Sequence, residues 1–324
     1  MSVKVSVCIP VYGVEKYIER CVRSLFEQTM RDGIEFVFVN DCTPDKSIEI
    51  LERVLTEYPH RREQTKIINL PDNGGVGRAR RIAIENCTGE YIIHCDPDDW
   101  VELDMYEKMY NTAKENDADM VYCDYFENYP IRELTKNFPL HTNCDTFLQD
   151  VLSGTIHCSL CNKLFRKEVA LSEDINAPEK VCLSEDYLMV SQMLLKCHRI
   201  ASCSKAYYHY FRARENSYTD PGSYKIEYFT GTCEIVDFLK EKLPDHQRKN
   251  LANFQAITLF KAVKHKLLPV KDFQKLWHKD RIRILLSPNL HIIKRLVLLS
   301  AYISYSGTTS ILQYLQKKRK FNKK

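Results

Sequence analysis

The sequence predicts an α/β fold in which helices wind around a parallel sheet, followed by a helical C-terminal extension. In residues 1–100, segments of strand and helix character alternate at a spacing of roughly thirty residues, which is typical of parallel strands joined by crossover helices. Polar clusters follow each of these strands. Residues 223–324 have helical periodicity throughout and a different charge balance.

Several segments have the β-branched and apolar composition of buried strands, and each ends at a proline or a polar turn. The expected strands are residues 3–10, 34–40, 65–70, 90–95 and 119–126. Apolar residues at helical spacing predict helices between them, including residues 76–87 and 104–115. Residues 127–157 carry few periodic patterns, so they receive no assignment.

The polar residues after the first four strands are predicted to share one edge of the sheet. Tyr12 follows the first strand, Asp41 the second, Asn73 the third and Asp96 the fourth. The carboxyl ends of parallel strands meet at one edge, and such sheets bind their ligands there. Ordinary surface turns explain each cluster separately but not their common position. We therefore predict a ligand site at this edge.

Three acids in four residues, Asp96, Asp98 and Asp99, end the apolar run of the fourth strand. Carboxylates this close repel one another unless a cation lies among them, and hard divalent cations take oxygen ligands. We predict that Asp96 and Asp98 hold a divalent metal, Mn²⁺ or Mg²⁺, together with a nucleoside diphosphate. Capping or orienting the following segment is the expected role of Asp99.

Two common classes of nucleotide site do not fit. The first strand-to-helix turn, residues 10–15, contains no G-x-G-x-x-G, and no Walker A lysine loop occurs in the chain. Gly74, Gly75 and Gly77 open a helix whose amides can face an anion, which is a weak signal by itself. The sequence thus argues against a Rossmann dinucleotide site and against a P-loop.

The cysteines indicate a reducing compartment. There are 13, an odd number, and several, such as Cys8 and Cys95, lie inside apolar runs. Cys158 and Cys161 form a C-x-x-C without a second pair at zinc spacing. No signal-peptide pattern opens the sequence, and no apolar stretch approaches the ~20 residues of a membrane-spanning helix. We expect a cytoplasmic protein.

Charge is distributed unevenly along the chain. Residues 1–224 carry 26 Lys and Arg against 36 Asp and Glu, net −10, whereas residues 225–324 carry 21 against 7, net +14. A basic tail favours a phospholipid surface or a nucleic acid, unless it serves solubility alone. Aromatic residues are not interleaved with the lysines of 317–324, which argues against nucleic acid. One apolar face of a segment that bears Lys294 and Arg295 is formed by Leu290, Ile293, Val297 and Ala301. This face fits a peripheral contact with the inner face of the cell membrane or, alternatively, a core-packing helix.

Six motifs occur in a fixed order along the chain, and together they carry a family resemblance. They are Pro10-Val11-Tyr12, Asn40-Asp41, Asn73-Gly74-Gly75, Ala79-Arg80, Asp96-Pro97-Asp98-Asp99 and Glu185-Asp186. With these motifs, residues 3–220 resemble the family 2 glycosyltransferases of GT-A fold. The resemblance implies a three-layer α/β/α sandwich in residues 1–222, with a nucleotide-binding half in 1–100 and an acceptor half in 101–222. A helical basic region then occupies residues 223–324.

The resemblance also implies roles for the residues of the nucleotide-binding half. Pro10 and Tyr12 match the residues that flank the nucleobase, and Asp41 matches the carboxylate that accepts a hydrogen bond from it. Asn73 and Arg80 match positions that complete the nucleoside and diphosphate pocket. Where the family commonly has Asp-Asp-Gly-Ser, this chain has Asn40-Asp41-Cys42-Thr43, so the turn after the second strand lacks its glycine.

For the chemistry, the resemblance places Asp96 against ribose and metal, Asp98 directly on the metal, and Asp186 as the catalytic base. The start of a helix also favours acids through its dipole, which by itself accounts for an acidic pair there. His209 lies where such enzymes often place a late histidine on the metal, although Tyr210 equally fits that position. A histidine packed among aromatic residues is the alternative for His209.

Two arginines follow this aromatic segment, and an extended backbone would direct Arg212 and Arg214 to one face, where they suit phosphate oxygens. The resemblance implies that both close over the diphosphate. Cys161 stands where the family often has an aromatic residue before Asn-Lys, a difference expected to alter acceptor choice more than catalysis.

The expected function is a metal-dependent inverting glycosyltransferase that moves a sugar from a nucleoside diphosphate donor, with UDP as the expected carrier. A single base without a carboxylate nucleophile implies direct displacement and inversion. The expected acceptor is a saccharide, free or lipid-linked, in cell-surface polysaccharide or lipopolysaccharide assembly. Two alternatives stay open: a sugar nucleotidyltransferase, and a sugar-nucleotide-binding module without turnover.

Overall fold

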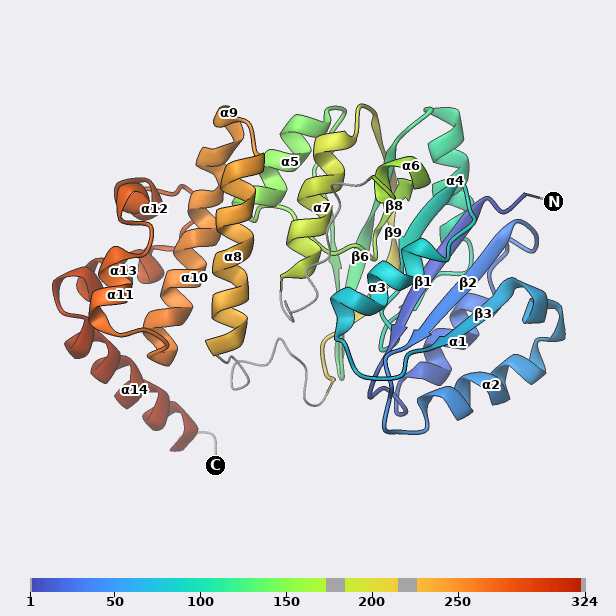
Figure 1. The fold of residues 1–324 in the computed structure, drawn as a ribbon, viewed down its shortest axis with the longest axis horizontal. Coiled ribbons are helices and arrows are strands. Elements are labelled where there is room, and N and C mark those ends of the chain that lie inside the picture. Colours follow the sequence, from blue (N-terminus) through green and yellow to red (C-terminus); the bar gives the residue numbers. More distant parts are fainter. Residues whose placement is uncertain (1, 173–183, 215–225, 322–324) are drawn as a thin grey trace. The chain divides into compact units, whose positions relative to one another are not determined.

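The computed structural model describes residues 2–172, 184–214 and 226–321. The chain forms two compact units, each shown in Figure 1: Met1–Leu148 with Cys158–Glu215, and Gln149–His157 with Asn216–Lys324. The first unit is α/β, and the second is helical wherever it is described. The expected boundary between residues 222 and 223 lies outside the described residues. The grouping of 149–157 with the helical unit was not predicted.

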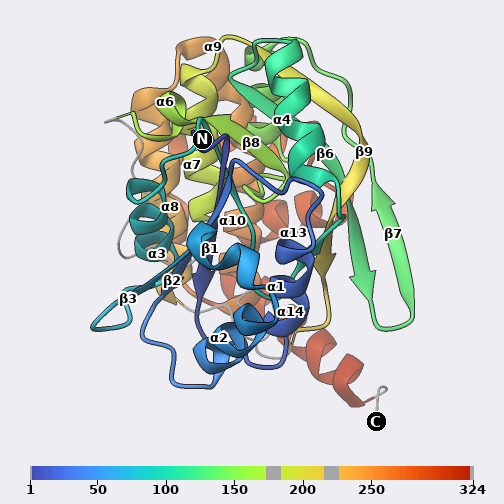
Figure 2. The same cartoon turned by 90° about the vertical axis from the view of Figure 1, so that its right-hand side faces the viewer.

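Four strands form the parallel part of the sheet, in the order β3-β2-β1-β4, of which β3, β2 and β1 are labelled in Figure 2. They are β1 (Val5–Val11), β2 (Ile34–Asn40), β3 (Thr65–Asn69) and β4 (Tyr91–His94). All four were expected, and the structure confirms them. Val11 lies opposite Asn40, and Cys8 lies opposite His94, so the strands deliver their following loops to one edge. Every residue of β1 is buried, as in a central parallel strand covered on both faces.

The other half of the sheet is mixed and continues in the order β8-β6-β9-β5. Here β8 (Lys163–Arg166) is antiparallel to β4 and β6 (Met120–Tyr129), β9 (Ile200–Phe211) is parallel to β6, and β5 (Trp100–Val101) is antiparallel to β9. The expected strand at 119–126 is confirmed as the buried start of β6. Its half-buried end pairs with β7 (Arg132–Lys136), a strand of mostly exposed residues that shows no apolar alternation in the sequence.

Helices cover both faces of the sheet, which confirms the three-layer prediction. On one face lie α1 (Ile18–Phe26), α2 (Ser47–Glu57) and α4 (Met105–Glu115), whose buried residues share a core with Val5, Val7 and Ile9 of β1. On the other face lies α3 (Val76–Glu85), where the Sγ atom of Cys87, just beyond the helix, is 3.3 Å from Sγ of Cys8. The remaining helices of this unit include η1 (Pro59–Gln64), α6 (Lys167–Ala170) and α7 (Glu185–Lys196). Helix α5 (Cys144–Ser153) begins in this unit, and its residues from Gln149 onward belong to the helical unit.

The second unit is built from helices around its own apolar core. Its α-helices are α8 (Ile226–Lys242), α9 (Asp245–Arg248), α10 (Ala252–His265), α11 (Val270–Lys275), α12 (Arg281–Leu285), α13 (Ile292–Ile303) and α14 (Tyr305–Phe321). Leu259 and Val263 of α10, Phe273, Trp277 and Leu298 meet in the core. Within the described part of the chain, no helix combines the length and the apolar character that crossing a bilayer requires.

Arg61 fixes the segment that follows α1, and we expect its loss to destabilise the fold. Its buried guanidinium donates hydrogen bonds to the carbonyls of Phe26, Gln28 and Met30, among others. Arg61→Met would leave these buried acceptors without a donor, so the free energy of unfolding should fall by about 3 kcal/mol. Urea denaturation measures this, with the exposed neighbour changed by Arg62→Met as the matched control. Equal stability of the two variants would contradict the assignment.

Candidate active site

Asp41 ties together two loops at the carboxyl edge of the sheet. It follows β2, is 3% exposed, and both of its carboxylate oxygens accept hydrogen bonds, from the N–H groups of Gly74 and Gly75 at 2.8 Å each. Gly75 has φ +88°, a left-handed conformation that favours glycine. The loop after β3 is therefore anchored to the end of β2 through this one carboxylate, beside the start of α3.

The turn after β2 keeps a left-handed conformation although it lacks the glycine of the common family pattern. Cys42 adopts φ +55°, a conformation that an L-residue with a side chain rarely takes. The Asn40 side-chain oxygen accepts a hydrogen bond from the Thr43 N–H at 2.9 Å, which closes the turn. The cysteine thus stands at a glycine-like position.

Arg80 lies at the centre of the site, among three carboxylates. It projects from α3, and its side chain is 3% exposed. Its Nη2 donates to Asp96 Oδ1 at 2.8 Å, while Nη1 donates to Glu185 Oε1 at 2.7 Å and to Asp186 Oδ1. The guanidinium therefore connects the acid at the end of β4 with the two acids that open α7. The sequence placed Arg80 in the diphosphate pocket and did not indicate its contact with Glu185.

The environment of Asp186 favours its protonated form more than water does. Burial raises the pKa of Asp186 to about 7; Arg80 opposes this rise, and the nearby charge of Glu185 adds to it. Burial likewise raises the pKa of Glu185, again with Arg80 opposing. A carboxylate whose pKa lies near neutrality is suited to take a proton from a substrate group.

Asp98 faces a different cation. Its Oδ2 accepts a hydrogen bond from Nη1 of Arg214 at 3.2 Å, and its side chain is 14% exposed. Burial raises the pKa of Asp98, with Arg214 lowering it and the charge of Asp96 raising it. Asp96 and Asp98 are therefore close enough to repel each other, each beside an arginine from a distant part of the chain.

Asp99 has a structural role that the sequence did not reveal. It is fully buried, and its two oxygens accept hydrogen bonds from the Tyr208 hydroxyl and from the Phe211 N–H. The Tyr208 oxygen in turn accepts a hydrogen bond from the N–H of Asp96 at 3.2 Å. Asp99 thus fixes the end of β9 against the turn that carries Asp96 and Asp98. Burial, together with the charges of Asp98 and Asp96, raises the pKa of Asp99 well above its usual range.

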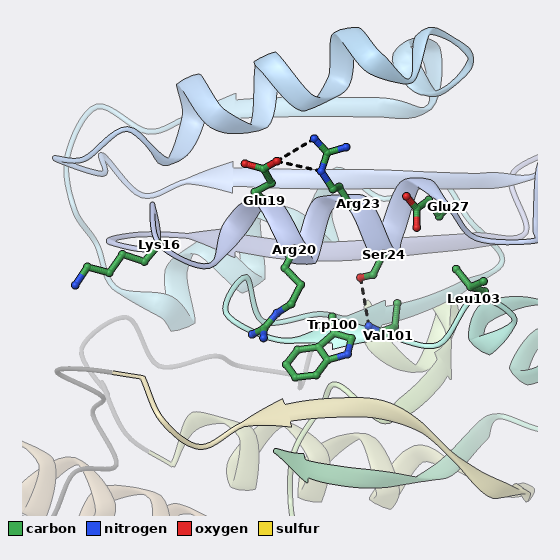
Figure 3. A pocket seen from close by; sticks show the side chains of 9 residues that line it. All are labelled: Lys16, Glu19, Arg20, Arg23, Ser24, Glu27, Trp100, Val101 and Leu103. Carbon is green, nitrogen blue, oxygen red and sulfur yellow. Dashed lines mark hydrogen bonds and ion pairs between the residues drawn. The ribbon is translucent and has the colours of Figure 1, made fainter. Parts of the chain in front are cut away.

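Arg20 supports the same turn from the other side. Figure 3 shows its side chain reaching from α1 across a groove to the ring of Trp100, and the guanidinium carbon lies 3.6 Å from the ring centroid. It also lies 4.7 Å from the ring of Phe211, and its Nη2 donates to the backbone carbonyl of Asp98 at 2.9 Å. From the sequence, Arg20 could be placed only on an expected helix, so its contact with the acidic turn was not predicted.

The structure does not bring His209 into a metal-ligand group. Its ring is stacked between Trp100 and Phe126, with centroid distances of 4.8 and 4.5 Å. Both ring nitrogens have partners, Nε2 with Glu102 at 2.8 Å and Nδ1 with Asn128 at 3.2 Å. In residues 2–172, 184–214 and 226–321, no group of three or more His, Cys, Asp or Glu side chains is arranged to hold a metal ion. The arrangement matches the alternative of a histidine packed among aromatic rings.

The remaining predicted residues separate into two groups. Tyr12, 40% exposed, follows β1, and Asn73 is exposed in the loop before α3, so both lie at the carboxyl edge. Pro10 is buried inside β1, opposite Val39 of β2. Arg212 and Arg214 were expected on one common face, but they have different contacts. The guanidinium carbon of Arg212, just beyond the end of β9, lies 5.0 Å from the ring centroid of Tyr210, whereas Arg214 contacts Asp98.

The comparisons with known proteins agree with this geometry. A model of glycosyl transferase family 2 matches residues 6–171. The chain is 29% identical over 249 residues to the poly(ribitol-phosphate) beta-glucosyltransferase of Bacillus spizizenii, a match that covers 76% of this chain and 38% of that protein. The chain therefore spans well under two thirds of this curated relative.

Solved structures share the fold. The crystal structure of Staphylococcus aureus TarS 1-349 in complex with UDP-GlcNAc has a TM-score of 0.66 at 20% identity, covering 97% of this chain and 92% of that chain. The mannosyltransferase PcManGT from Pyrobaculum calidifontis, in complex with GDP-Man and Mn²⁺, has a TM-score of 0.55 at 14% identity, covering 94% and 88%. The predicted GT-A architecture is thereby confirmed.

Arg20 should shield Trp100 and hold the acidic turn in place. Arg20→Ala removes both the stacking on the ring and the hydrogen bond to Asp98, so we expect a stability loss of about 1–2 kcal/mol. Tryptophan fluorescence should also become more accessible to acrylamide. Lys16→Ala, in the same groove, is the matched control and should change neither quantity. Unchanged quenching in Arg20→Ala would contradict the stacking.

Proposed function

Because the chain belongs to the family 2 glycosyltransferases, we propose that it transfers a sugar from a nucleoside diphosphate, with UDP as the carrier, to a saccharide acceptor. One observation carries the proposal. Arg80 links Asp96, at the end of a parallel strand, to Asp186, whose pKa lies near neutrality. Asp96, which suits the metal and diphosphate of a donor, thus lies close to Asp186, which suits the removal of a proton from an acceptor.

In this proposal the nucleotide lies along the carboxyl ends of β1, β2 and β3. Pro10 and Tyr12 flank the base, and Asn73 completes the nucleoside pocket. Asp41 accepts a hydrogen bond from the base in addition to those from Gly74 and Gly75, because each carboxylate oxygen carries two lone pairs. The choice of UDP is supported by TarS, whose structure was solved with UDP-GlcNAc.

A divalent metal fits the chemistry of the acidic turn. Asp96 and Asp98 supply hard oxygen ligands, and the charge of Asp96 adds to the burial that raises the pKa of Asp98, so a cation beside both carboxylates would relieve their repulsion. We propose that these two carboxylates hold Mn²⁺ or Mg²⁺; PcManGT was solved with Mn²⁺. When bound, the ion would supply positive charge for the leaving diphosphate. His209 is not included, since both of its nitrogens are engaged elsewhere.

Asp186 acts as the general base in the proposed mechanism. Its carboxylate takes the proton of the acceptor hydroxyl while the hydroxyl oxygen forms a bond to the anomeric carbon. The bond from that carbon to the diphosphate oxygen breaks, and its electron pair leaves with UDP. Displacement from the opposite side inverts the configuration. Arg80 fixes the orientation of Asp186 through its hydrogen bond and keeps Asp96 in position beside it.

We propose that Arg214 assists the leaving group. It already contacts Asp98 and the carbonyl of Gly13, the residue that follows Tyr12, so its guanidinium lies at the same edge as the acids. The sequence predicted that Arg212 and Arg214 would both close over the diphosphate. We now assign this role to Arg214 alone, because Arg212 faces Tyr210 and Glu127 instead.

The acceptor is proposed to belong to cell-surface polymer assembly, on the cytoplasmic side of the membrane. The support is the similarity to the poly(ribitol-phosphate) beta-glucosyltransferase of Bacillus spizizenii. The expected acceptor half of the site includes residues 173–182, which lie outside the described residues. We further propose that the basic region, residues 223–324, gives the enzyme a peripheral contact with an anionic membrane.

A panel of ligands tests the donor. The protein should be stabilised against heating by UDP and UDP-sugars together with Mn²⁺, and less by either nucleotide or ion alone, because ligand that binds only the native state adds about 2.7 kcal/mol at a hundredfold excess over Kd. GDP and GDP-sugars form the second arm. Stabilisation by GDP compounds would correct the donor, and no stabilisation by any nucleoside diphosphate would overturn the function.

Asp186→Asn should abolish transfer without abolishing donor binding. The amide cannot accept the hydroxyl proton, so we expect kcat/KM to fall about a thousandfold, while the UDP–Mn²⁺ affinity measured by calorimetry changes little. Asp145→Asn, at the exposed start of α5, is the matched control and should be fully active. If Asp186→Asn transferred sugar as fast as the control, Asp186 would not be the general base.

The rate should depend on pH through Asp186. The base works only when deprotonated, so kcat/KM should rise as pH increases through about 7 and then level off. Since Arg80 lowers this pKa, Arg80→Gln should move the rise to higher pH. Arg78→Gln is the control. Arg78 lies on the same helix as Arg80, and the substitution breaks only its ion pair with Asp72, a residue that precedes the helix. If Arg80→Gln does not shift the pH at which kcat/KM rises, the group whose deprotonation controls the rate is not Asp186.

A further inference from the structure

We propose that one face of α13 is the surface by which this enzyme binds an anionic membrane. The face consists of Ile292, Leu296, Leu299 and Ile303 and is called the α13 stripe. The inference deepens the membrane contact in the proposed function and depends on it for its biological setting. It rests on the exposure of these four side chains and on the charge of the surrounding sequence.

The α13 stripe is apolar and uncovered. Its four side chains follow one another at i, i+4, i+7 and i+11, which places them on one side of a helix. They are 56%, 57%, 41% and 88% exposed. A surface helix of a water-soluble unit normally turns polar residues to solvent, and a row of large apolar side chains there marks a contact surface.

The opposite side of α13 already has its packing partners. Leu298 and Ala301 are fully buried in the core of the helical unit, together with Leu259 and Phe273. Arg295 donates a hydrogen bond to the carbonyl of Ser287 at 2.8 Å, which fixes the helix on its unit. The α13 stripe is therefore distinct from the side of the helix that packs in the core. It is a second apolar face.

The charge of the sequence around the stripe selects the occupant. No Asp or Glu occurs after Asp280, whereas residues 281–324 contain ten Lys and Arg. The exposed Ile311, Tyr314 and Leu315 of α14 continue the apolar surface along the chain, and Lys317-Lys318-Arg319-Lys320 follows them. Apolar side chains flanked by cations alone match the boundary between acyl chains and anionic headgroups.

The geometry specifies a helix that lies on the membrane. With 12 residues, α13 is roughly 18 Å long, too short for a hydrocarbon core of about 30 Å. A helix lying in the interface plane inserts only its apolar side. A second copy of the chain would bring two strongly basic surfaces together, which disfavours self-association through this face.

Vesicle flotation with the full chain tests the proposal. Wild-type protein should float with phosphatidylcholine vesicles that contain phosphatidylglycerol, should not float with phosphatidylcholine alone, and should detach as salt is raised. The stripe variant carries Ile292→Gln, Leu296→Gln, Leu299→Gln and Ile303→Gln. Its partition coefficient should fall at least about tenfold, because four apolar side chains lose their membrane contact.

The matched control removes exposed apolar residues elsewhere. Ile131→Gln with Leu140→Gln changes side chains that are 97% and 75% exposed in the α/β unit, and vesicle binding should be unaffected. Circular dichroism establishes that both variants are folded, as expected for exposed positions. Light scattering after size exclusion gives the oligomeric state of each protein without lipid.

The outcomes separate this proposal from the enzymatic one. Anionic-lipid binding that the stripe variant loses and the control retains supports it. Three results overturn it: wild type that does not bind at physiological salt, a stripe variant that binds like wild type, or a wild-type dimer that the stripe variant converts to monomer. UDP release with a soluble acceptor should be equal in all three proteins. Its absence from all of them would refute the transferase function and leave the lipid result standing.

Discussion

The buried ion cluster around Arg80 is the constraint on which the rest of the site depends. Three carboxylates share this one guanidinium, and a charge so far from water is stable only where opposite charges and hydrogen bonds surround it. The cluster joins the end of β4 to the start of α7, segments about ninety residues apart in the sequence. Burial is the main cause of the raised pKa of Asp186, and the nearby charges of Glu185 and Asp96 add to the rise while Arg80 opposes it. The excess of carboxylates over guanidinium fits a divalent cation nearby.

A second set of contacts holds the acidic turn rigid without touching a substrate. Asp99, Tyr208 and Phe211 connect the turn to β9, and Arg20 connects it to α1 through Trp100. Acids that must keep a fixed separation gain from such support, because small displacements of ligands weaken both ion binding and catalysis. The turn is thereby attached to both β9 and α1, while Asp96 and Asp98 keep part of their surface open.

The two units solve different physical problems with similar helices. In the α/β unit, each helix buries one apolar face against the sheet, and the polar residues collect at the carboxyl edge. In the helical unit, α13 buries one face in a core and exposes a second apolar face, in a stretch of sequence without acids. The first pattern creates a polar site for a charged donor. The second creates a surface whose composition suits the membrane on which a lipid-linked acceptor would lie.

The sequence by itself determined the parallel strands and the positions of Asp41 and Asp96 after them, because strand periodicity and turn chemistry are local properties. The expected role of Asp186 came from the family resemblance that the six motifs carry. It could not determine which side chains meet across the sheet. Only the tertiary structure directed Arg80 to Glu185, gave Asp99 its bonds to β9 and enclosed His209 between two rings, since these contacts join residues far apart in the sequence, for example 105 positions for Arg80 and Glu185 and 112 for Asp99 and Phe211. It also showed the exposed side of α13, because apolar periodicity is the same whether a face meets a core or solvent.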